Sequence, residues 1–149
     1  MNFYVNYSNV SDDFDEQEKR IALIFELNEA PEANMETLLG YRNFLEKRLV
    51  LPVRVTGIED FDWEEFYVLG PGDKDEYDEL KKIQPSYNDV FEMTGLKGEI
   101  DDLRGILVNV RRLSDRKTFV LPLADLETVE KSTEASAIVH DYVVWYVNY

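Results

Sequence analysis

The spacing of apolar residues changes at Pro52, and this change constrains the fold more than any other feature of the sequence. Before the proline, apolar residues recur every three or four positions, which predicts an amphipathic helix from Met35 to just before Pro52. Its apolar face consists of Leu38, Tyr41, Leu45 and Leu49. After the proline, Val53 and Val55 alternate with polar residues, as in a half-buried strand. The chain must therefore combine helices with strands.

The remaining sequence contains further segments of both kinds. A helix is predicted at about 14–29, with Asp12 and Asp13 as candidate N-caps, and a short charged helix at 73–83. A C-terminal helix is predicted from Ser132, because aromatic residues recur there at helical spacing, although the valines of this segment would also suit a strand. Strands are predicted at 3–10, 53–57, 66–69, 89–93, 105–110 and 118–122, with a single helical turn at 123–126.

These elements together predict an α+β fold. We expect two N-terminal helices, then a small curved antiparallel sheet or partly open, SH3-like barrel of about five strands, then a C-terminal helix. The sequence has no internal repeat and no linker rich in proline, glycine or serine, so residues 1–149 are expected to form a single domain. At this length about two-thirds of the unfolded surface can be buried, which is enough for a hydrophobic core.

The composition excludes several classes of function. Acidic residues number 31 against 16 basic ones, and the net charge of −15 disfavours binding to the phosphate backbone of nucleic acids. The chain has no cysteine and one histidine, His140, which excludes thiolate metal sites and multi-histidine sites within one chain. The sequence has no segment resembling a signal peptide and no apolar run of membrane-spanning length, so we expect a cytoplasmic protein without membrane contact.

No arrangement of residues predicts an enzyme. His140 and Asp141 are adjacent, and adjacent residues on a helix do not face each other, so the two do not form an acid–base pair. No serine has the strand–turn–helix context of a nucleophile. The turn Gly70-Pro71-Gly72 lacks the lysine and the following helix of a phosphate-binding loop. We therefore expect a protein without catalytic activity.

The acidic residues are clustered, and the clusters predict a metal site. Ten acidic residues and one lysine lie between Glu59 and Glu79, and Glu99, Asp101 and Asp102 precede the strongest predicted strand. Crowded carboxylates repel one another unless a cation lies among them, and calcium accepts about six to eight oxygen ligands in flexible geometry. The spacing fails the EF-hand pattern, so a calcium site would combine separate loops. For any single cluster, the alternative is a solvated face that aids solubility.

The basic residues are also grouped, at 42–54 and at 104–117. We expect most of them to pair with acids of the same chain. If they instead shared one face, the protein would have a dipolar surface suited to a protein partner. The alternative function is therefore an acidic protein–protein interaction module, such as an inhibitor or immunity-type protein that covers a basic partner.

Four segments between residues 39 and 149 follow one another in the order of a known family's motifs. They are a helix running into a strand at 41–53, acids before an alternating strand at 99–112, a Val-Leu-Pro-Leu step at 120–126, and a closing helix with Thr133, Ala137, Ile138, Asp141, Tyr142 and Trp145. This order resembles the small acidic calcium-binding protein family of cyanobacterial type (CcbP-like). Tyr142 departs from the tryptophan of the family pattern, and the segment at about 61–96 is longer and diverged. Residues 1–33 are an N-terminal extension outside the resemblance, and 34–149 would be the calcium-binding domain.

The resemblance implies calcium binding through carboxylates. Asp101, Asp102 and Asp141 occupy positions that match the family pattern. Charge density in the first cluster adds Asp60, Asp62, Glu64 and Glu65. We therefore expect a cytoplasmic calcium buffer or low-affinity sensor that binds this divalent cation through loops around 60–65 and 99–102.

Overall fold

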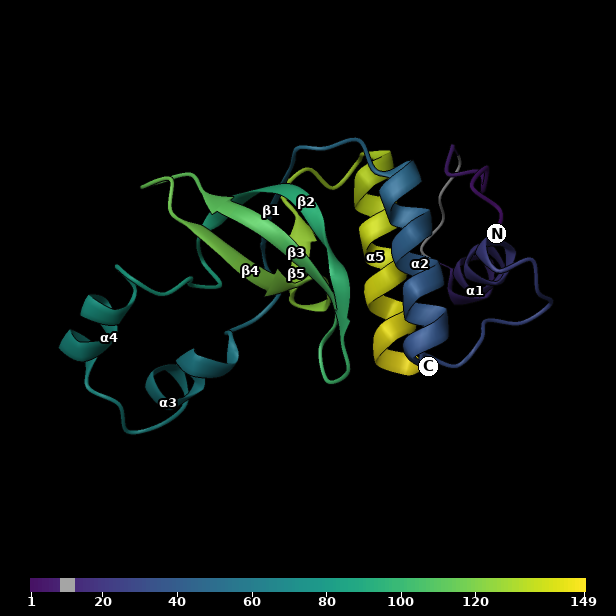
Figure 1. The fold of residues 1–149 in the computed structure, drawn as a ribbon. Coiled ribbons are helices and arrows are strands. Elements are labelled where there is room, and N and C mark those ends of the chain that lie inside the picture. The colour runs from purple at the N-terminus through teal and green to yellow at the C-terminus, as the bar shows by residue number, and fades with distance from the viewer. Residues whose placement is uncertain (9–12) are drawn as a thin grey trace.

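The structure, a computed structural model, describes residues 1–8 and 13–149, and it confirms the α+β fold class (Figure 1). The helices are α1 (Phe14–Ile24), α2 (Met35–Arg48), α3 (Glu65–Val68), α4 (Lys74–Leu80) and α5 (Glu134–Asn148), with 3-10 turns η1 (Asp62–Glu64) and η2 (Leu123–Asp125). The strands are β1 (Val53–Gly57), β2 (Val90–Asp101), β3 (Gly105–Arg112), β4 (Thr118–Pro122) and β5 (Leu126–Thr128).

The five strands form one open antiparallel sheet in the order β4-β3-β2-β1-β5. The register of β2 on β3 shifts twice, between Met93 and Gly95 and again between Leu96 and Ile100, and such irregularities increase the local twist and bend of a strand. The turn from β2 to β3 requires Gly105, because its φ is 77° and a Cβ there would lie 2.6 Å from the Tyr142 hydroxyl. Gly105 thus lets the hairpin lie directly against α5.

Helices α2 and α5 lie side by side against one face of the sheet, and α1 packs on α5 (Figure 1). An aromatic cluster joins α2 to α5: the ring centroids of Tyr41 and Trp145 are 4.9 Å apart, and those of Tyr41 and Tyr142 are 5.3 Å apart. All three side chains are fully buried. Such pairs contribute about 0.5–1.5 kcal/mol each beyond the apolar area they bury. The predicted aromatic face of the C-terminal helix is therefore the centre of the core.

Helix α1 begins and ends where local capping dictates. The carboxylate of its N-cap, Asp13, accepts a hydrogen bond from a backbone amide in the first turn, whereas the other candidate cap, Asp12, lies outside the described residues. The helix ends at Ile24, earlier than the predicted 29, because Glu26 takes a positive φ of 57° and closes the C-terminus. Ile21 and Ile24 are buried, so this N-terminal segment contributes to the core.

Two predicted strands were wrong, and one strand was missed. Residues 66–69 lie in and just after helix α3 rather than in a strand, because this segment packs on its own aromatic neighbours instead of on the sheet. Residues 3–8 form no strand, and the rest of the predicted strand 3–10 lies outside the described part of the chain. Strand β5 was missed, since three residues are too few to show an alternating pattern.

Residues 58–89 connect β1 to β2 and project beyond the sheet on the side opposite α1; we call this segment the lobe (Figure 1). The two strands that it joins are direct antiparallel neighbours, with Thr56 opposite Val90. Such neighbours need a loop of only about 2–5 residues, so the lobe is a long insertion with helices of its own. No helix in the described part of the chain is long and apolar enough to cross a membrane.

Candidate cation-binding site

The seven acidic residues predicted as ligands are spread over three regions of the molecule. Asp60, Asp62, Glu64 and Glu65 lie at the start of the lobe, Asp101 and Asp102 at the turn from β2 to β3, and Asp141 within α5. Among residues 1–8 and 13–149, no three or more acidic or histidine side chains are arranged to hold a metal ion. Each of the three regions therefore has to be considered by itself.

Glu64 is fully buried and its carboxylate is already occupied by protein donors. One oxygen accepts hydrogen bonds from the backbone amides of Phe61 and Tyr87, both at 3.0 Å. The other accepts from the hydroxyls of Tyr77 at 2.9 Å and Ser86 at 2.6 Å. Burial and the hydrogen bond to Glu64 raise the pKa of Tyr77 to about 12. These four bonds join η1, α4 and the end of the lobe, so Glu64 acts as a structural clamp.

A second clamp, Arg112 of β3, fixes the C-terminal part of the lobe to the sheet. Its guanidinium is buried and pairs with Asp89 at 2.9 Å and with Asp115 at 2.8 Å. The hydrogen bonds to Arg112 hold the pKa of Asp115 at about 2. The guanidinium also donates to the backbone carbonyls of Lys81, Lys82 and Gln84, which follow α4. A cation is favoured there, because the carbonyls at a helix C-terminus carry partial negative charge.

Asp141 is buried within α5, and its cation is Arg20 from α1. The guanidinium binds both carboxylate oxygens, at 3.0 and 2.9 Å, and Gln17 donates a third hydrogen bond at 2.9 Å. The nearby hydroxyls of Tyr7 and Tyr41 are buried without a hydrogen-bond partner in the described part of the chain, and burial raises the pKa of both. The N-terminal segment thus supplies the charge that neutralises Asp141.

The remaining predicted ligands reach solvent. Glu65 and Asp102 are exposed, and Asp60 is half-buried. Asp101 closes the turn between β2 and β3, where one of its carboxylate oxygens accepts hydrogen bonds from the backbone amides of Leu103 and Arg104, at 2.9 and 2.8 Å. Its second oxygen is not used by this turn. Asp101 can therefore turn an oxygen outward without loss of the local structure.

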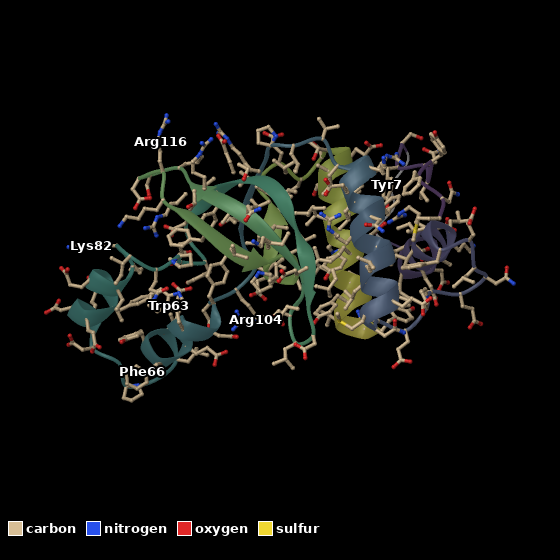
Figure 2. The ribbon with its side chains drawn as sticks, viewed as in Figure 1. Tyr7, Trp63, Phe66, Lys82, Arg104 and Arg116 are labelled. Atoms are coloured by element: carbon tan, nitrogen blue, oxygen red, sulfur yellow. The ribbon has the colours of Figure 1, made fainter. Side chains whose placement is uncertain are left out.

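A cleft of about 470 Å³ separates the lobe from the sheet, and it brings together acids from distant segments. Its lining includes Asp62 from η1, Asp125 from η2, Arg104 from the β2–β3 turn and Tyr146 from α5. Trp63 and Arg104 lie between α3 and the sheet in Figure 2. The walls are otherwise mostly apolar, formed by Phe61, Trp63, Pro85, Leu103, Phe119, Val120, Leu121, Pro122 and Ala124.

Negative charge is crowded at the mouth of this cleft. Asp125 reaches solvent, but neighbouring groups remove part of its hydration, and this desolvation raises the pKa of Asp125. The charges of Asp62 and Glu59 raise this pKa further, while Arg104 acts in the opposite direction. Burial raises the pKa of Tyr146, and the charges of Asp101 and Asp125 add to that rise. Asp62 and Glu59 therefore act on Asp125, and Asp101 and Asp125 both act on Tyr146, at this place.

Sequence reasoning found two of these residues and missed two. Asp62 and Asp101 were predicted as ligands; Asp62 lines the cleft with Asp125, and the charges of Asp101 and Asp125 both act on Tyr146. Asp125 and Glu59 were not proposed, although Asp125 lies inside the 120–126 step that carries part of the family resemblance. The position of Asp125 in that step was the signal in the sequence that could have indicated it as a candidate ligand. The ligand assignments themselves stay predictions.

Comparison with known proteins supports the fold. Searches with protein-family models and among curated protein sequences find no match to this chain. The crystal structure of CcbP from Anabaena is similar over 93% of this chain and 94% of the CcbP chain, with a TM-score of 0.57 and 16% sequence identity. A likeness at this identity concerns the arrangement of elements and not individual residues. The chain therefore has a CcbP-like fold.

Proposed function

We propose that this protein binds calcium ions at the mouth of the cleft, through the carboxylates of Asp62, Asp125 and Glu59, with Asp101 of the β2–β3 turn as a further ligand. The observation that carries the proposal is that Asp62 and Asp125 line one cleft, where desolvation and the charges of Asp62 and Glu59 raise the pKa of Asp125. A carboxylate in such surroundings is stabilised by a cation more than a solvated one is. The CcbP-like fold and the family resemblance of residues 39–149 support the same function.

The donor chemistry of the cleft favours a hard cation. All of the candidate ligands are oxygens, and calcium accepts carboxylates, backbone carbonyls and water in flexible geometry at about 2.3–2.6 Å. Magnesium requires near-octahedral geometry and loses its water reluctantly, so ligands that come from separate turns suit it less well. Calcium is therefore the ion that we expect the site to prefer.

The arrangement supports weak rather than tight binding. The acids are near one another but do not form a ready coordination sphere in the described residues, so side chains must rotate to bind the ion. Arg104 lines the same cleft, and its charge opposes the accumulation of positive charge there. Both effects reduce affinity, which agrees with a calcium buffer or low-affinity sensor.

The test is thermal unfolding and calorimetric titration of the wild type and of Asp62→Asn/Asp125→Asn, with calcium, magnesium or chelator at equal ionic strength. Ligand at 100 times its Kd adds about 2.7 kcal/mol of stability. We expect calcium to raise the Tm more than magnesium does, and the double variant to bind calcium about tenfold more weakly or worse. The matched control is Asp75→Asn/Asp78→Asn, which removes the same charge from exposed positions of α4. Equal losses of calcium affinity in both double variants would contradict the proposal, because they would indicate general charge screening.

A further inference from the structure

Helix α3 and its C-cap, Leu69, expose three apolar side chains at the outer end of the lobe. The exposed fractions are 54% for Phe66, 41% for Val68 and 78% for Leu69; we call these residues the tip. Figure 2 shows Phe66 at the far end of the lobe, pointing away from the sheet. Phe66 and Leu69 are three residues apart along a helical turn, so their side chains are neighbours. Single exposed apolar residues are common, but adjacent ones mark interaction sites.

The tip is held rigidly from within the lobe. The amide of Gly72 donates to the carbonyl of Phe66 at 3.0 Å, and a Cβ at Gly72 would lie 2.4 Å from the ring of Tyr67. The ring of Tyr67 stacks on that of Tyr77, with centroids 5.3 Å apart and planes within 8°. Glu64 then holds the lobe together, and Arg112 fixes it to the sheet. A surface that is already ordered loses little conformational entropy when it binds.

The tip is surrounded by negative charge. The segment from Glu59 to Glu79 contains ten acidic residues and one lysine, a local net charge of −9. Glu65 precedes the tip directly, and the first turn of α4 adds Asp75 and Glu76, all of them exposed. This charge repels nucleic acids and anionic membranes, and it attracts a protein surface rich in lysine and arginine.

We propose that the tip of the lobe docks into an apolar depression on a positively charged surface of a partner protein. Phe66 and Leu69 would be the anchors, because large apolar side chains at the centre of an interface carry most of its binding energy. The acids around them would form the polar rim and speed association. This interaction is separate from calcium binding, since the tip does not line the cleft.

The probe is a synthetic helical peptide of lysine and leucine with one apolar face, measured by fluorescence anisotropy and by mapping amide chemical shifts. A peptide with serine in place of leucine tests charge alone, and vesicles of anionic lipid test a membrane as the partner. The variants are Leu69→Ser, whose side chain is too exposed to affect folding, and Phe66→Ser/Leu69→Ser. The control is Val50→Ser/Val147→Ser, at exposed apolar positions outside the lobe.

We expect the lysine–leucine peptide to shift amides at the tip and along α4. Its affinity should fall about tenfold or more in Phe66→Ser/Leu69→Ser, fall less in Leu69→Ser alone, and stay unchanged in the control. The lysine–serine peptide should bind much more weakly, and the vesicles should not bind. Equal affinity in all variants, or shifts spread over every acidic face, would overturn the proposal, as would vesicle binding through the tip. Calcium titration of the same variants keeps this outcome distinct from a failure of the calcium site.

Discussion

Replacing Glu64 tests whether this residue is a structural clamp, as its contacts indicate, or a calcium ligand, as the sequence predicted. Glu64→Ala removes the acceptor of four hydrogen bonds. The amides of Phe61 and Tyr87 cannot turn elsewhere, and each buried donor left without a partner costs about 1–3 kcal/mol. With the smaller contribution of the two hydroxyls, we expect a loss of about 3–6 kcal/mol. This is a large share of a typical total stability of about 5–15 kcal/mol.

The isosteric variant Glu64→Gln sharpens the test. Its amide oxygen can still accept from the two backbone amides, and its amino group would face the hydroxyls of Tyr77 and Ser86, which can rotate to accept. Only the strengthening of these hydrogen bonds by the negative charge is lost, so we expect the free energy of unfolding to fall by about 1–2 kcal/mol. The neighbouring exposed residue gives the control, since the stability of Glu65→Ala should stay within about 0.5 kcal/mol of the wild-type value.

The assay is urea unfolding followed by tryptophan fluorescence. The chain has two tryptophans, Trp63 in the lobe and Trp145 in the core, so a Trp63→Phe background separates the two regions. Loss of stability in Glu64→Ala should appear first in the Trp63 signal. A Glu64→Ala protein as stable as the wild type would refute the clamp. Calcium binding lost in a fully stable Glu64→Gln would show that Glu64 is a ligand after all.

Three further predictions follow from the same contacts. Arg104→Gln should raise calcium affinity several-fold in calorimetry, because the competing positive charge beside Asp125 is removed; unchanged or weaker binding would contradict this. The pKa of Tyr77 is raised to about 12, so its contribution to stability is complete below about pH 10 and lost as the pH rises from 10 to 12; the Trp63 signal should report this loss, and Tyr77→Phe should reduce the pH dependence, the remainder coming from the other tyrosines of raised pKa. Arg20→Ala leaves the buried carboxylate of Asp141 unpaired and should lower the free energy of unfolding by about 3–5 kcal/mol, measured by urea unfolding. A loss of less than about 1 kcal/mol would mean that another group neutralises Asp141.

The sequence allowed the order of the elements to be predicted because most of them have a clear apolar period. The alternation through β3 places Ile106, Val108 and Val110 in the core, and the helical spacing of α2 and α5 places their aromatic residues there. Residues 66–69 could not be assigned in this way. Their aromatic and β-branched side chains favour a strand locally, but the contacts that decide in favour of a helix come from Trp63 and from the turn at Gly72.

The candidate site was less predictable, because the roles of carboxylates depend on partners distant in sequence. Arg20 lies 121 residues from Asp141, and no local pattern connects them. Glu64 has acidic neighbours in the sequence but faces only donors in the fold. A signal was also available for the second clamp: Arg112 continues the buried alternation of β3, and an arginine at such a position needs carboxylates and carbonyls around it.

The most direct measurement of the central claim is terbium luminescence excited through tryptophan, since terbium replaces calcium at oxygen sites and Trp63 lines the cleft. If carboxylates from η1, η2 and the β2–β3 turn bind the ion together, wild-type protein should sensitise terbium, and calcium should quench the signal by displacing it. Trp63→Phe and Asp62→Asn/Asp125→Asn should each abolish the emission, while Asp75→Asn/Asp78→Asn keeps it. Emission that survives in the first two variants, or that calcium does not displace, would contradict the account.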